Sequence, residues 1–188
     1  MRGQNKIIFF ILVLLILLPG CQLQKKVSID RNRYIPEFSV PDPAYKGKML
    51  NLLSLVDKAN DISLGYYYSS DKEIIYENQY GSIMSYLWYC FRDGLLHAGL
   101  GVLEDAKPDG NIPDLLITIN SVTDRHFEFQ IRLAKGGVTL LEKKMAVESG
   151  PTADNSNAAL ERNAYAMMDK AVQAILKDGE FKKAFLSK

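Results

Sequence analysis

Residues 126–133 read HFEFQIRL and alternate polar and apolar side chains without interruption. The apolar side chains all fall on one side of this alternation: Phe127, Phe129, Ile131 and Leu133. Successive side chains of a β-strand point to opposite faces of the sheet, so this spacing places one face in a core and the other in water. The stretch therefore predicts a half-buried antiparallel strand.

The flanking segments extend this strand into a meander. Lys135-Gly136-Gly137 has the glycines of a hairpin turn, and residues 138–147 (VTLLEKKMAV) return beside the first strand. On the other side, Asp124-Arg125 turns the chain after residues 114–122, in which Leu115, Ile117 and Ile119 alternate with polar side chains. Three consecutive antiparallel strands follow from this pattern.

Two helices are predicted around the meander, over residues 80–98 and 156–178. The buried face of the first helix follows three- and four-residue spacing: Ile83, Leu87, Cys90, Phe91 and Leu95. The apolar stripe of the second helix is equally regular: Leu160, Ala164, Met167, Met168, Ala171, Ile175 and Leu176. Residues 179–188 begin with a glycine, and we expect them to pack loosely through Phe181 and Phe185.

The first half of the folded region contains shorter elements. Residues 34–48 hold three prolines and predict an extended segment, and strands are expected at 61–68 and 74–76. Residues 49–57 are short and apolar and fit a strand or a helix about equally, of which the strand is preferred. The order of strands, helix, meander and helix predicts an α+β fold. We expect two layers, with a mainly antiparallel sheet and two helices on one face.

The N-terminus has the features of a secretory signal. Arg2 and Lys6 precede an apolar run over residues 7–18, which is shorter than the roughly 20 residues of a membrane-spanning helix. Leu18-Pro19-Gly20-Cys21 resembles a bacterial lipobox, in which a small residue precedes a cysteine whose thiol carries a diacylglyceryl group. The alternatives are an uncleaved signal anchor and an ordinary secretory signal.

The lipobox resemblance implies a division of the chain into three parts. Residues 1–20 would be a lipoprotein signal peptide, 21–33 a lipidated tether beginning at Cys21, and 34–188 a single periplasmic domain. Two or more acyl chains hold a protein stably on a membrane. Gln22 follows the cysteine, and the absence of Asp there favours the outer membrane in the enterobacterial sorting code.

Composition excludes several classes of partner. Removal of residues 1–20 leaves 21 Lys and Arg against 22 Asp and Glu, so the mature chain is nearly neutral. A nucleic-acid-binding protein would carry a marked excess of basic residues, so no nucleic-acid partner is expected. No phosphate-binding glycine loop or metal-binding spacing occurs, so no cofactor and no metal are expected either.

No catalytic motif stands out, and the chain is expected not to be an enzyme. Cys90 lies within an aromatic helical run and is interpreted as an inert buried thiol. His97 and His126 are isolated from other ligand residues. Asp105, Asp109 and Asp114 surround a loop but do not match a calcium-binding spacing, so a solvated turn explains them better.

Tyrosines cluster in residues 66–80 and suggest a contact surface. The candidates for partner or lipid contact are Tyr66, Tyr67, Tyr68, Tyr76 and Tyr80. Consecutive strand residues face opposite ways, so Tyr66, Tyr67 and Tyr68 cannot all lie in the core. The outward tyrosines either contact a partner or a lipid or stabilise neighbouring strands.

The chain resembles the ABC-type transport auxiliary lipoproteins, which are the outer-membrane components of MCE-type lipid transport systems. The lipobox Cys21 and Tyr34 are followed by the stretch IIYENQY at 74–80 and the first helix. The strands DLLITINSV and FEFQIRL, the hairpin strand with Leu140-Leu141, Pro151 and an alanine-rich last helix complete the similarity.

This resemblance implies a non-enzymatic role. The lipid-anchored protein would dock a lipid conduit at the periplasmic face of the outer membrane, with an MCE-domain protein of an ABC transport system as its partner. Self-association is also consistent with the resemblance. The stretch 66–80 and the helical residues 83–91 are the expected contact regions.

Two other functions remain open. The first is a lipoprotein that assembles lipopolysaccharide or outer-membrane proteins, which a basic ligand-facing patch would favour. The sequence offers only Arg132 and Lys143-Lys144 for such a patch. The second is a tethered periplasmic hydrolase, which would need a pocket with a perturbed carboxylate or histidine.

Overall fold

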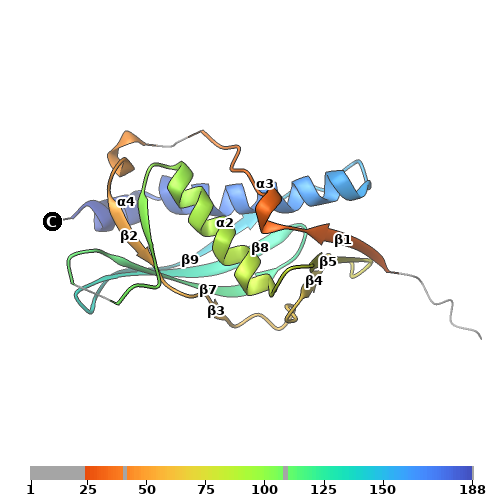
Figure 1. Cartoon of the computed structure of the whole chain (residues 1–188), viewed down its shortest axis with the longest axis horizontal. Coiled ribbons are helices and arrows are strands. Elements are labelled where there is room, and N and C mark those ends of the chain that lie inside the picture. The colour runs from red at the N-terminus through yellow and green to blue at the C-terminus, as the bar shows by residue number, and fades with distance from the viewer. Residues whose placement is uncertain (1–23, 40–41, 108–109, 188) are drawn as a thin grey trace, which may run out of the picture.

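The computed structural model describes residues 24–39, 42–107 and 110–187. The expected signal peptide at 1–20 and the lipidation residue Cys21 lie outside the described residues. The chain forms two β-sheets with helices packed against them (Figure 1). The predicted α+β class is confirmed, although a second sheet and a third helix add to the single sheet and two helices expected.

The larger sheet contains the predicted meander. Its strand order is β6 (Gly101–Glu104), β2 (Met49–Leu52), β7 (Asp114–Val122), β8 (His126–Lys135) and β9 (Val138–Glu148). Strands β7, β8 and β9 are antiparallel, as expected, whereas β2 runs parallel to both β6 and β7. The short β3 (Val56–Asp57) pairs with β7 beyond β2.

The alternation in β8 places four side chains in the core. Phe127, Phe129, Ile131 and Leu133 are all fully buried. Phe91 of the first helix contacts this layer, with ring centroids 6.1 Å from Phe127 and 5.8 Å from Phe129. The sequence pattern thus predicts correctly which face of β8 the helices cover.

A smaller sheet forms from segments that are distant in sequence. β1 (Lys25–Ile29) pairs in parallel with β5 (Ile74–Asn78), and β4 (Tyr66–Tyr68) pairs with β5 on its other side. Val27 and Ile29 of β1 are fully buried. The prediction that residues 21–33 form a tether is therefore wrong from residue 25 onward, because β1 belongs to the folded domain.

Both predicted helices form, each with a serine N-cap. Ser82 caps α2 (Ile83–His97) by accepting from the N–H of Ser85, and Ser156 caps α3 (Asn157–Lys177) by accepting from that of Ala159. The predicted buried face of α2 and the predicted stripe of α3 are all buried. Two short 3-10 turns, Arg31–Arg33 and Pro43–Tyr45, hold the proline-rich segment between β1 and β2.

The expected loose C-terminus is a third helix. α4 (Gly179–Leu186) begins at the N-cap Asp178, whose carboxylate accepts from the N–H of Phe181. Phe181 and Phe185 are buried and stack with ring centroids 5.7 Å apart. The expectation of loose packing is wrong because these two rings lie one turn apart on the face that meets the core.

Helices α2 and α3 cross at a glycine. A Cβ atom built on Gly94 would lie 2.7 Å from Cγ2 of Val172, so the crossing requires the absence of a side chain there. Among the residues described, no helix combines the length and apolar character needed to cross a membrane.

Candidate functional site

The structure divides the five candidate tyrosines between core and surface. Tyr67 and Tyr76 face inward from paired strands and stack with ring centroids 4.9 Å apart. Burial raises the pKa of both phenols well above the ordinary value. Tyr67 and Tyr76 therefore stabilise the core, and their assignment as partner or lipid contacts is wrong.

The neighbouring tyrosines of β4 point the other way, as the alternation predicts. The rings of Tyr66 and Tyr68 meet edge to face at 5.3 Å. A hydrogen bond between their hydroxyls lowers the pKa of Tyr66 and raises that of Tyr68. Tyr80, before α2, is 71% exposed. These three remain available to a partner or a lipid.

A groove lies along the outer face of α2, opposite its buried face. It has a volume of about 390 Å³ and is lined by Ser54, Leu55, Met84, Ser85, Trp88, Tyr89, Glu104 and Asp105. The indole N–H of Trp88 donates to the carbonyl of Leu53 at 3.0 Å, which fixes the ring against the β2–β3 connection. The adjacent Tyr89 meets Trp88 edge to face at 5.0 Å.

Two arginines contact the ring of Tyr89 at the aromatic side of this groove. The guanidinium of Arg31 lies 3.8 Å from the ring centre of Tyr89, and that of Arg92 lies 4.6 Å from it on the same helix. Arg92 also pairs with Asp93 at 2.8 Å and Glu104 at 3.2 Å. Cation–π contacts and ion pairs of this kind orient the rings and leave apolar surface between charged borders.

Apolar side chains continue this surface beyond the start of α2. The N–H of Ile83 donates to the carbonyl of Leu64 at 2.9 Å, so Leu64 lies beside the first turn of the helix. Its side chain is 85% exposed. We call the combined area the α2 surface, and define it by Leu55, Leu64, Tyr80, Met84, Trp88 and Tyr89.

Part of the α2 surface was not predicted from the sequence. Residues 83–91 were expected to include a contact region, but Leu55 and Leu64 come from loops whose position depends on the fold. Met84 and Trp88 are four residues apart and lie off the buried face, so their spacing was a usable signal of a second apolar stripe.

The residues best suited to catalysis or metal binding have structural partners. Cys90 is buried on the inner face of α2, and burial raises its thiol pKa well above the ordinary value. His97 Nε2 contacts the carbonyl of Phe38 at 2.8 Å, and His126 is partly exposed, 3.9 Å from Glu128. In the described parts of the chain, no three His, Cys, Asp or Glu residues gather as a metal site would require.

The aspartates of the 105–114 loop are also engaged. Asp105 accepts from the hydroxyl of Ser54 at 2.9 Å, and Asp114 accepts from the amide of Asn51 at 2.6 Å. Asp109 lies outside the described residues. The two described aspartates thus fasten both ends of this segment to β2 and to Ser54 just after it.

A second groove follows the outer face of α3. It has a volume of about 600 Å³ and lies between this helix and residues 33–37. At its edge, Asp169 accepts from the hydroxyl of Tyr34 at 2.8 Å and from the N–H of Glu37 at 3.1 Å. Burial raises the pKa of Asp169 despite these bonds. Tyr34 thus anchors the segment after β1 to the last long helix.

Comparisons with known proteins establish the fold. The sequence matches no protein-family model and no curated protein. Protein XCC0632 of Xanthomonas campestris, which belongs to the family DUF330, superposes with a TM-score of 0.56 at 11% identity, over 81% of this chain and 92% of that one. An uncharacterized protein gives 0.51 at 11% identity, over 81% and 98%. This chain therefore shares their fold.

A third structure is less similar. Lipoprotein GNA1162 from Neisseria meningitidis gives a TM-score of 0.37 at 13% identity, over 68% of this chain and 98% of that one. We draw no conclusion from a similarity of this size.

Proposed function

We propose that this protein is a lipid-anchored, non-enzymatic periplasmic component of an ABC/MCE-type lipid transport system. It docks the lipid conduit at the outer membrane. Cys21 carries the lipid, and the α2 surface binds the MCE-domain partner. The observation that carries the docking role is the apolar and aromatic strip on the outer face of α2, in which Leu64 and Tyr80 are exposed and Met84, Trp88 and Tyr89 are half-buried.

The character of the α2 surface supports a protein partner. Aromatic residues and methionine are enriched at protein interfaces relative to other surfaces, and this strip contains Tyr80, Met84, Trp88 and Tyr89. Arg92 and Glu104 border it with charge, which matches the polar rim of an interface. The groove beside Trp88 could receive an apolar side chain of the partner.

The neighbourhood of the buried thiol supports a non-enzymatic role. A nucleophilic cysteine needs a lowered pKa and a base within hydrogen-bond reach. Cys90 is buried, and that burial raises the pKa of its thiol. The proposal therefore assigns Cys90 to packing.

Site-specific photocrosslinking in native membranes tests this proposal. A benzophenone amino acid replaces Tyr80 in the full-length chain, and a matched variant carries it at Arg132, an exposed position on the polar face of β8. We expect the Tyr80 variant to capture an MCE-domain protein, together with its ABC permease after mild solubilisation. The Arg132 variant should not capture it.

Two outcomes would refute parts of this proposal. Capture of a large outer-membrane barrel from Tyr80, without an MCE-domain protein, would refute the transport role and indicate envelope assembly. Equal capture of the MCE-domain protein from both positions would refute the assignment of the docking site to the α2 surface.

A further inference from the structure

The first described residues are fastened to one end of the molecule. The backbone N–H of Lys25 donates to the carbonyl of Glu73 at 3.2 Å, and the side-chain amide of Gln24 donates to the carbonyl of Lys72 at 3.0 Å. The side chain of Lys25 also donates to the carbonyl of Asn155. The chain therefore leaves the fold beside the β4–β5 turn and the loop before α3.

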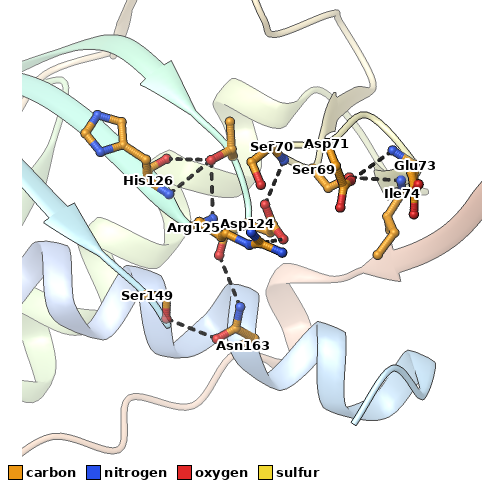
Figure 2. A network of polar contacts seen from close by, with 11 residues as sticks. Ser69, Ser70, Asp71, Glu73, Ile74, Asp124, Arg125, His126, Ser149 and Asn163 are labelled. Carbon is orange, nitrogen blue, oxygen red and sulfur yellow. Dashed lines mark hydrogen bonds and ion pairs between the residues drawn. The ribbon is translucent and has the colours of Figure 1, made fainter. Parts of the chain in front are cut away.

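Other turns meet at the same end and make it rigid (Figure 2). The N–H of Ser70 donates to the carboxylate of Asp124 at 2.8 Å, and the amide of Asn163 donates to the carbonyl of Asp124 at 3.1 Å. Ser149 donates to Asn163 at 3.1 Å. We call this end the N-terminal pole and define it as residues 24–26, 69–73, 123–125 and 149–156.

The link between this pole and the proposed lipidation residue is short. Three peptide units separate Cys21 from Gln24, and consecutive Cα atoms are about 3.8 Å apart, so the two residues lie at most about 11 Å apart. The tether of a dozen residues predicted from the sequence would have allowed several times this reach. A lipid on Cys21 therefore restricts the pole to the immediate vicinity of the bilayer.

We propose that the N-terminal pole is a membrane-docking face that lies on phospholipid headgroups and sets the orientation of the domain. This inference depends on the proposed lipidation of Cys21. It is independent of which protein binds the α2 surface.

The direction of α3 gives the height of the molecule above the membrane. The side chain of Asn157, at its start, contacts the carbonyl of Lys26 at the pole. Its 21 residues span about 31 Å at 1.5 Å per residue. The helix runs along the long axis to the end that carries α4 and the β8–β9 hairpin (Figure 1). That end projects away from the bilayer.

This orientation also distinguishes among the outward-facing tyrosines. Tyr68 pairs with Ile75 and is the last residue before the β4–β5 turn, so it lies next to the pole. Tyrosine is enriched at the headgroup level of membranes because its ring is apolar and its hydroxyl is polar. We assign lipid contact to Tyr68, and leave Tyr80 on the α2 surface for the protein partner.

The charges of the pole indicate how it meets the lipid. Lys26, Lys72 and Arg125 are exposed there, but so are Asp71, Glu73 and Asp154. A face that carries both signs has little net attraction to anionic lipids. The acyl anchor, and not electrostatic attraction, therefore holds the pole at the membrane.

The test uses the full-length, lipidated protein in vesicles of phosphatidylethanolamine and phosphatidylglycerol. One variant carries a fluorescent label at Lys72→Cys, at the pole, and the matched variant carries it at Val138→Cys, in the distant hairpin. Both native side chains are exposed, whereas Cys90 is buried and escapes labelling. A lipid with a paramagnetic headgroup serves as the quencher.

We expect quenching to remove most of the fluorescence at Lys72→Cys and little at Val138→Cys. Equal quenching at the two positions, or stronger quenching at Val138→Cys, overturns the proposed orientation. Acylation is measured separately by incorporation of radioactive palmitate into the wild type and a Cys21→Ser variant. A wild-type chain that takes up no palmitate refutes the proposed anchor itself, so the two failures are distinguishable.

Discussion

Replacement of Gly94 by alanine tests the close crossing of α2 and α3. In an exposed helix interior, Gly→Ala stabilises by about 1 kcal/mol because it removes backbone freedom from the unfolded chain. Here the added methyl would lie 2.7 Å from Cγ2 and 3.1 Å from Cγ1 of Val172. Val172 is fully buried and, as a β-branched helical residue, has one strongly preferred rotamer. It cannot rotate out of the way.

The change in the free energy of unfolding on Gly94→Ala is the sum of two opposing contributions. Overpacking a core costs about 1–3 kcal/mol, which offsets or exceeds the gain of about 1 kcal/mol from helix propensity. We expect Gly94→Ala to lower the free energy of unfolding by about 0–2 kcal/mol. At about 2–4 °C per kcal/mol for a domain of this size, the melting temperature falls by about 0–8 °C.

A double-mutant cycle with Val172→Ala tests whether the clash with Val172 causes the loss of stability. Val172→Ala removes both Cγ atoms and leaves only the Cβ atom of residue 172, 3.2 Å from the added methyl. In that variant most of the clash is relieved, so Gly94→Ala should be less destabilising than in the wild type and can stabilise by up to about 1 kcal/mol. Urea unfolding of the four proteins of this cycle gives the coupling energy. The chain without residues 1–20, and with Cys21→Ser, serves as the parent. An equal stabilising effect of Gly94→Ala in both backgrounds would show that the helices are not in contact there.

Three other measurements address separate features. Ile29→Ala should lower the free energy of unfolding by about 2–5 kcal/mol because its side chain is buried. Ser28→Ala on the same strand is the control and should change that free energy by at most about 0.5 kcal/mol. Equal urea midpoints for the two variants would mean that β1 is not packed against the core. Burial raises the folded-state pKa of Asp169, so its contribution to stability is full below its unfolded pKa near 4 and is lost as pH rises through the folded pKa. Asp169→Asn should therefore lose less stability than the wild type between about pH 4 and pH 7, and a parallel decline in the urea midpoints of both proteins would contradict the shift. Cys90 should resist a maleimide in the folded chain and react in urea, and rapid labelling of the native protein would contradict its burial.

Local patterns in the sequence predicted the core of the fold well. The alternation in β8 and the helical spacing in α2 and α3 are properties of short windows, and each places its buried face without knowledge of the partner. The short elements were harder to predict from the sequence. Val27 and Ile29 give only two alternating positions within a polar stretch, and the pairing of β1 with β5 joins residues about 50 positions apart.

The candidate site was only partly predicted, because local patterns do not show how the elements pack together. Alternation shows that Tyr67 opposes Tyr66 and Tyr68, but it cannot show which face the core will cover. That choice depends on where α2 and the smaller sheet pack. Leu55 and Leu64 reach the α2 surface through loops, whose course is a result of the folded structure and leaves no periodic signal.

The fastening of β1 to late parts of the chain has a consequence for the order of folding. The backbone of Asp30 exchanges hydrogen bonds with the hydroxyl of Tyr165, which lies 135 residues later. Contacts of such sequence separation form slowly, because a long loop must close before they contribute. The strand β1 can pair with β5 as soon as residues 74–78 have emerged, but the contacts of Asp30 and Tyr34 with α3 cannot form until that helix has left the ribosome or translocation channel. The segment after β1 is therefore fixed in place later than β1 itself.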